Sequence, residues 1–281
     1  MQIRFIVATR HDEATFFQQS LLVRSLESLQ PSFAFSLEPV FRSSEGMAAV
    51  YNPAIERAGP QDLLVFVHDD VFVEDWCLDA RLQEGLGAFD VIGVAGARAR
   101  QSGQMAWWGT EVGGRIVASA AVAQSGSIKH IRRRRHQAAA RLLAARLGLN
   151  RSRRDWQRSW RGVAEGRYEL LPRDRPCGMA LSARHQGSGV GRLDRFGPTP
   201  APVQLLDGVL IAARAGRLQS SAVRFDPQFG YHAYDLDFCR QCEQAGLSMG
   251  TWPIALAHGS AGCWDQRWRS AAQAYLRKWG D

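Results

Sequence analysis

The first 70 residues alternate between short apolar runs and stretches whose apolar residues recur at helical spacing. Ile3–Ala8 and Leu63–Val67 are almost wholly apolar and residues 33–40 form a third such run, so three strands are predicted. A second helix is expected over 47–58, after a first one that Pro31 closes. The first helix is predicted from the spacing of Phe16, Phe17, Leu21, Leu22, Leu26 and Leu29. This alternation indicates a βαβα unit with a parallel sheet.

The rest of the pattern is more interrupted. Residues 89–96, 115–122 and 203–212 predict further strands, and residues 235–245 have the period of a helix. Residues 172–202 are rich in Pro, Gly, Ser and Arg, which predicts a long loop. A final helix is predicted from aromatic residues four, seven and four positions apart: Trp264, Trp268, Tyr275 and Trp279.

Length and composition favour one large α/β domain, alone or with an insertion. The chain has 281 residues, of which 46% are hydrophobic, enough for a full core. No apolar run approaches the roughly 18 residues of a membrane span, and the N-terminus has the pattern of a strand rather than of a signal peptide. A cytoplasmic location is therefore expected. The cysteines are odd in number and scattered, as is typical of reduced thiols: Cys77, Cys177, Cys239, Cys242 and Cys263.

The positive charge is concentrated in one segment. Residues 129–161 contain twelve Lys or Arg and one acid, Asp155, a net charge of +11; the remainder carries 23 basic and 26 acidic residues, a net charge of −3. Such a run is interpreted either as a solvated insertion or, with its leucines and Trp156 and Trp160, as a peripheral contact with an anionic membrane surface. Nucleic acid is disfavoured because no recognisable binding module surrounds the run.

Two adjacent carboxylates, Asp69 and Asp70, follow the buried run Leu63–Val67. Like charges side by side repel and resist desolvation unless a cation lies between them and a ligand. In parallel sheets ligands bind beyond the carboxyl ends of the strands, and Thr9 and Arg10 follow another predicted strand at such an end. The pattern therefore predicts a divalent-metal site that carries a phosphorylated substrate.

Four short stretches together resemble the GT-A type glycosyltransferases, most closely the family-2-like bacterial members. They are residues 46–55 (GMAAVYNPAI), 66–71 (FVHDDV, in the place of the DxD-type motif), 206–211 with 225–238 (LDGVLI and FDPQFGYHAYDLDF), and 257–262 (AHGSAG). The resemblance covers about residues 1–110 and 203–265. It implies a Rossmann-like, mixed but mainly parallel sheet flanked by helices, with an Arg-rich helical or loop insertion.

The resemblance also implies an organisation and a reaction. One domain over 1–281 would comprise a nucleotide-binding half at 1–110, the basic insertion at 129–200, and an acceptor half with the last helix at 203–281. It would transfer a sugar from a nucleotide-diphosphate sugar to an acceptor hydroxyl on a glycan or lipid-linked molecule, with inversion, in bacterial surface polysaccharide or lipopolysaccharide synthesis. Mn²⁺ or Mg²⁺ would neutralise the departing diphosphate.

Roles for single residues follow from the same resemblance. Asp70 and His258 would bind the metal, and Asp69 would contact the ribose or assist the metal. Asp235 would be the base that accepts the proton of the acceptor hydroxyl, with Asp237 in reserve; Tyr234 stands where the family usually has Glu. The remaining candidates for contacts with the nucleotide, donor sugar or acceptor are Thr9, Arg10, Asn52, Asp207 and Gly208.

The same residues also allow other interpretations. The acidic pair could be a turn or a helix cap, Asp235 and Asp237 could be the acidic first turn of a helix, and His68 and His258 could be ordinary hydrogen-bonded histidines. At the level of the whole chain, the rivals are metal-dependent nucleotidyl or phosphoryl transfer by the same carboxylates, and a non-catalytic membrane- or nucleic-acid-binding protein on a GT-A scaffold.

Overall fold

The structure is a computed structural model that describes residues 1–30, 32–112, 115–118, 176–183, 191–197, 199–260 and 265–280. For residues 109–112, 115–118, 176–183 and 191–197 the course of the backbone alone is described. The Arg-rich run 129–161 lies outside the described residues, and so do the interpretations placed on it. Among the described helices, none is long and apolar enough to cross a membrane.

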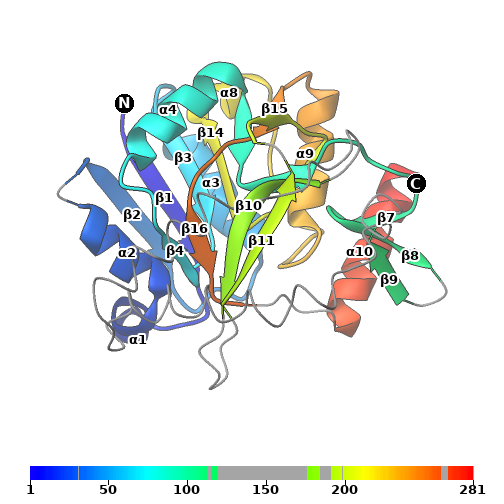
Figure 1. Cartoon of the computed structure of the whole chain (residues 1–281), viewed down its shortest axis with the longest axis horizontal. Helices are drawn as coiled ribbons and strands as arrows, with labels where there is room; N and C mark the ends of the chain where they lie inside the picture. Colours follow the sequence, from blue (N-terminus) through cyan, green and yellow to red (C-terminus); the bar gives the residue numbers. More distant parts are fainter. Residues whose placement is uncertain are drawn as a thin grey trace.

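The main sheet has seven strands and is mixed but mainly parallel (Figure 1). Strand β1 pairs in parallel with β2 and β3, and β15 pairs in parallel with β5, whereas β14 and β12 run antiparallel to their neighbours. In sheet order the strands are β12 (Ala201–Pro202), β15 (Met249–Thr251), β5 (Val91–Gly93), β14 (Leu210–Arg214), β3 (Leu63–Val67), β1 (Ile3–Ala8) and β2 (Phe35–Val40). The predicted fold class, a Rossmann-like α/β sheet flanked by helices, is confirmed.

Helices flank this sheet, and the first predicted helix is in fact two. It divides at Ser20, whose backbone is extended and whose hydroxyl accepts a hydrogen bond from the Val23 amide and donates one to the Asp69 carbonyl at 2.7 Å. This side-chain capping starts a second helix with a new direction. The helices are α1 (Glu13–Gln19), α2 (Leu21–Leu29), α3 (Met47–Arg57), α4 (Leu78–Ala88), α8 (Ala215–Ser220), α9 (Tyr234–Gln244) and α10 (Gln266–Trp279).

A second sheet is formed by other strands, several of which directly follow strands of the main sheet along the chain. Its order is β13 (Leu205–Leu206), β6 (Ala95–Ala97), β10 (Pro176–Ala183), β16 (Leu256–His258) and β4 (Val71–Val73), with β11 (Gly191–Gly197) paired to β10. The predicted strand 89–96 thus divides into β5 and β6, and the predicted strand 203–212 into β13 and β14, one in each sheet. The long loop predicted over 172–202 is wrong where the structure describes it, because β10 finds its partners in β6 and β16, far away in sequence.

The last helix packs against a small third sheet. This sheet consists of β7 (Gln104–Ala106), β8 (Gly109–Val112) and β9 (Arg115–Ala118), the last within the predicted strand 115–122. Helix α10 lies beside it (Figure 1), and Trp268 and Ala272 of the helix pack with Met105 and Ala106. The predicted final helix is confirmed over Gln266–Trp279, and its Trp268 and Tyr275 are buried, whereas Trp264 lies outside the described residues.

An aromatic core joins the two halves of the chain beneath the carboxyl ends of the strands. Tyr51 of α3 packs against Phe66 of β3 and against Phe225, with ring centroids 4.7 and 4.9 Å apart. Phe225 in turn stacks on Phe238 of α9 at 4.3 Å. Large buried rings of this kind contribute strongly to core stability, so the segment before α9 is held firmly against β3.

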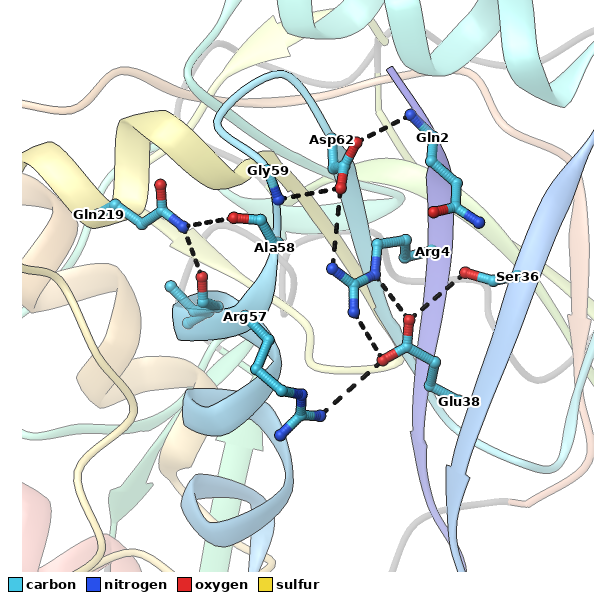
Figure 2. A network of polar contacts seen from close by, with 10 residues as sticks. Gln2, Arg4, Ser36, Glu38, Arg57, Ala58, Gly59, Asp62 and Gln219 are labelled. Atoms are coloured by element: carbon cyan, nitrogen blue, oxygen red, sulfur yellow. Dashed lines mark hydrogen bonds and ion pairs between the residues drawn. The ribbon is translucent and has the colours of Figure 1, made fainter.

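A polar network holds the amino ends of β1 and β3 (Figure 2). Arg4 pairs with Glu38 of β2 at 2.6 Å and with Asp62 at 3.7 Å, and Asp62 also accepts a hydrogen bond from the Gly59 amide. Gln219 of α8 donates to two carbonyls at the end of α3. These contacts fix the strand ends opposite to those that carry Thr9 and the acidic pair.

Asp237 fastens the last helix to α9. Its carboxylate is fully buried and accepts hydrogen bonds from Lys278 Nζ at 2.6 Å, Trp279 Nε1 at 2.8 Å and Gln241 Nε2 at 2.6 Å. Lys278 also pairs with Asp226 at 2.7 Å. A buried charge satisfied in this way becomes costly when one partner is removed.

We expect Lys278→Met to lower the free energy of unfolding by about 2 kcal/mol, because Asp237 loses a charged hydrogen-bond donor. Urea denaturation measures this change. Arg277→Met, on the neighbouring exposed position of the same helix, is the matched control and should stay within about 0.5 kcal/mol of the parent. Equal stabilities of the two variants would contradict this role of Lys278.

Candidate metal centre and active site

The candidate centre lies where the chain turns from the main sheet into the second one. His68, Asp69 and Asp70 form the turn between β3 and β4, closed by a hydrogen bond from the Val71 amide to the His68 carbonyl. Strand β4 pairs with β16 in antiparallel fashion, and this register sets His258 opposite Val71. The Gly259 amide donates to the Asp70 carbonyl at 2.8 Å. Backbone pairing therefore brings Asp70 and His258 together.

Three side chains in this turn and strand end could hold a metal ion. One potential ligand atom from each of His68, Asp70 and His258 lies within 4.8 Å of the others, and His258 Nε2 is 3.3 Å from Asp70 Oδ1. The side chains of His258 and Asp70 are 18% and 34% exposed, so the group is accessible. Two imidazoles and a carboxylate form a donor set that divalent transition metals accept.

The charges of the three groups are strongly coupled. Burial opposes ionisation of Asp70, but its hydrogen bond with His258 and the charges of both histidines hold the pKa of Asp70 below its ordinary value. Burial alone would lower the pKa of His258, yet Asp70 and the nearby acids raise it. Burial and the neighbouring His258 lower the pKa of His68. The lowered pKa values of Asp70 and His68 favour a carboxylate and a neutral imidazole, which are the forms that bind a cation, whereas His258 would have to give up a proton to bind one.

Asp69 points to a different neighbour from Asp70. Its carboxylate accepts a hydrogen bond from Thr9 Oγ1 at 2.5 Å, and its carbonyl accepts from the Ser20 hydroxyl and the Leu22 amide. Thr9 is buried, whereas Arg10, the next residue, is exposed. The two adjacent acids therefore have different surroundings: Asp70 belongs to the group of histidines and Asp69 to the end of β1.

Asn52 joins α3 to the segment that contains Phe225 and precedes α9. Its amide nitrogen donates to the Phe225 carbonyl and its side-chain oxygen accepts from the Phe225 amide, both at 2.8 Å. One end of α3 makes a similar contact, since the Met47 amide donates to the Gly230 carbonyl at 3.0 Å. Gly46 has φ +91°, and a Cβ there would come within 2.7 Å of Gly230 Cα, so this close approach requires glycine. The polar groups of Asn52 are thus used within the protein.

Asp207, Gly208 and the start of α9 form the other side of the centre. Asp235 Oδ2 accepts a hydrogen bond from the Gly208 amide at 3.0 Å. The hydroxyl of Tyr234 donates to the Gly208 carbonyl at 3.2 Å and lies 2.8 Å from His68 Nε2. Asp235 is partly exposed, and burial together with the charge of Asp207 raises the pKa of Asp235 to about 7. A carboxyl group with this pKa can exchange protons near neutral pH.

The structure therefore brings most of the candidates to one end of the sheet but separates Asp237 from them. Asp237 faces α10, as described above, while Asp235 faces Gly208. Two members of the centre were not chosen from the sequence, namely His68 as a potential ligand and Tyr234 as its partner. The position of His68, directly before the acidic pair at the strand end, was the signal that could have found it.

No protein-family profile matches the sequence, and no curated protein matches it either. Solved structures with a weak overall similarity do exist, among them the following two. A197 from STIV is 11% identical, with 92% of this chain and 86% of that chain covered and a TM-score of 0.38. The mannosyltransferase PcManGT from Pyrobaculum calidifontis, in complex with GDP-Man and Mn²⁺, is 12% identical, with 100% and 64% covered and a TM-score of 0.43. Both TM-scores are below 0.5, and the chain spans less than two thirds of the mannosyltransferase.

We expect Asp70→Asn to weaken Mn²⁺ binding by more than about 100-fold, because it removes the only carboxylate of the described His–Asp–His group. Loss of a residue that only hydrogen-bonds to a metal ligand already weakens metal binding by about 10–100-fold. Isothermal titration calorimetry with Mn²⁺ measures the affinity. Asp79→Asn, in the first turn of α4, is the control and should bind as the parent does. If Asp70→Asn binds Mn²⁺ unchanged, the ion does not use this group.

Proposed function

We propose that the chain is a metal-dependent glycosyltransferase that moves a sugar from a nucleotide-diphosphate donor to an acceptor hydroxyl. The observation that carries the proposal is one constellation: the group of His68, Asp70 and His258 stands beside Asp235, whose pKa is raised to about 7. Sugar transfer from a diphosphate needs both parts, a site for positive charge at the leaving group and a base at the attacking hydroxyl.

The residues present fit a divalent cation. When bound, it would supply charge neutralisation for the departing diphosphate. Mg²⁺ prefers all-oxygen ligand sets, whereas this group contains two imidazoles, so Mn²⁺ fits better than Mg²⁺. His68, Asp70 and His258 would hold it.

Asp235 is assigned the role of general base. Its carboxylate would accept the proton of the acceptor hydroxyl while the hydroxyl oxygen forms a bond to the anomeric carbon. The bond between the sugar and the diphosphate breaks at the same time, and the nucleoside diphosphate leaves. This single displacement inverts the configuration at the anomeric carbon. The hydrogen bonds from the amides of Gly208 and Leu236 hold the carboxylate in place and keep its pKa from rising further.

The donor is assigned to the carboxyl ends of β1 and β3. Thr9, Arg10 and Asp69 lie there, and Asp69 is oriented by the Thr9 hydroxyl, so these residues would contact the nucleoside and its phosphates. Asp207 and Gly208 would border the sugar between the metal group and Asp235. The acceptor and its setting, a glycan or lipid-linked molecule in bacterial surface polysaccharide synthesis, come from the resemblance to family-2-like members.

The direct test is the product released from labelled nucleotide sugars in the presence of Mn²⁺. Sugar transfer predicts a nucleoside diphosphate, and activity should be lost with a chelator and restored by Mn²⁺. A thermal-shift screen of nucleotide sugars with and without Mn²⁺ selects the donor, because a ligand that binds the folded state raises the Tm. Release of pyrophosphate would instead indicate nucleotidyl transfer, and chelator-resistant turnover would exclude the metal role.

For the base, we expect Asp235→Asn to lower kcat by about 10²–10⁴-fold, the usual contribution of a positioned base. In the parent, kcat/KM should rise with pH and level off above about pH 7, because the ionised carboxylate is the active form. Positive charge at the metal group would move this inflection to lower pH. The variant should lack the inflection. Glu243→Gln, on the exposed side of α9, is the control, and full activity of Asp235→Asn would exclude the assignment.

A further inference from the structure

Tyr234 joins the acceptor-side helix to the candidate metal group. It is the first residue of α9 and is 4% exposed, and its hydroxyl contacts two groups: the Gly208 carbonyl at 3.2 Å and His68 Nε2 at 2.8 Å. The resemblance to glycosyltransferases gives no role to a tyrosine here, since the family usually has Glu at this position. The role of Tyr234 therefore has to be inferred from its contacts in this protein.

The donor and acceptor roles in this pair of contacts follow from counting protons. A tyrosine hydroxyl has one proton to donate, and a carbonyl oxygen can only accept. With the hydroxyl proton of Tyr234 donated to the Gly208 carbonyl, the hydroxyl oxygen is left to accept from His68 Nε2. This assignment places the proton of His68 on Nε2. In a neutral imidazole the other nitrogen, Nδ1, then has a free lone pair.

The backbone around Gly208 is adapted to this arrangement. A Cβ at position 208 would overlap the Tyr234 hydroxyl, so glycine is required for the hydroxyl to reach the carbonyl. The same residue uses its amide to bind Asp235. One residue, Gly208, thus fixes both Tyr234 and Asp235, and through Tyr234 it is connected to His68.

We propose that Tyr234 is a positioning residue that holds His68 in the tautomer protonated on Nε2 and presents Nδ1 to the metal ion. This inference rests on the proposed metal-dependent function and adds a residue to it. Metal-bound histidines commonly donate their second ring N–H to an oxygen atom, and that partner fixes the ring orientation and the tautomer. Tyr234 provides such an oxygen from the helix that also carries the proposed base.

The tautomer can be measured in the metal-free protein without any substitution in the test molecule. Long-range ¹H–¹⁵N NMR spectra distinguish a ring protonated on Nε2 from one protonated on Nδ1, and the His68 signals are assigned by their loss in His68→Gln. We expect protonation on Nε2 in the parent and a mixture of tautomers in Tyr234→Phe. Protonation of the parent's His68 on Nδ1 would overturn the proposal.

Metal affinity gives the second readout. We expect Tyr234→Phe to weaken Mn²⁺ binding by about 10–100-fold, as is usual for the partner of a ligating histidine. Tyr51→Phe is the matched control: Tyr51 is equally buried, its ring lies 6.3 Å from that of Tyr234, and its hydroxyl has no hydrogen-bond partner among the described residues. Its Mn²⁺ affinity should equal that of the parent.

The outcomes separate the two proposals. Unchanged Mn²⁺ affinity in Tyr234→Phe, with the parent binding Mn²⁺, overturns the role of Tyr234 and leaves the glycosyltransferase proposal standing. Failure of the parent to bind Mn²⁺ overturns the metal-dependent function, while the tautomer of His68 in the parent and in Tyr234→Phe still decides whether Tyr234 sets it. Equal weakening in Tyr51→Phe would show a general packing effect and would also overturn the specific role.

Discussion

The antiparallel pairing of β4 with β16 is the constraint on which the candidate centre depends. The turn 68–70 follows β3 of the main sheet. The next strand, β4, lies in the second sheet and pairs with β16, which is close to the C-terminal end of the chain. Because the register sets His258 opposite Val71, the backbone alone places Asp70 next to His258. Backbone hydrogen bonds thus assemble the charged group, and the buried β3 anchors it.

A single residue connects the metal group to the proposed base. Gly208 binds Asp235 through its amide and Tyr234 through its carbonyl, and Tyr234 contacts His68. Each of these contacts is at most 3.2 Å long, so Gly208 and Tyr234 link the positions of His68 and Asp235. The proposed single displacement places the leaving group and the attacking hydroxyl on opposite sides of one carbon atom, and a defined spacing between the candidate metal group and the proposed base would favour that geometry.

Two carboxylates on α9 show how surroundings rather than residue type decide a role. Asp235 and Asp237 are two positions apart, which separates them by about 200° around a helix of 3.6 residues per turn. Asp237 faces α10, where an ammonium group, an indole and an amide satisfy its charge. Asp235 faces Asp207 and the Gly208 amide, which leaves it with a raised pKa. The first fastens a helix, and the second is suited to proton transfer.

The amino-acid sequence alone determined the helices and strands that depend on apolar periodicity and on capping or turn residues within one segment. The bounds of β1 and β3, the helices near 47–58 and 235–245, and the placing of Asp70 at a strand end follow from apolar periodicity and end signals. Strand pairing between distant segments leaves little trace in local sequence, because each partner supplies only backbone groups. The tertiary structure therefore decided that the region 172–202 contains β10 and β11, that residues 89–96 serve two sheets, and that His68 and Tyr234 join the acids.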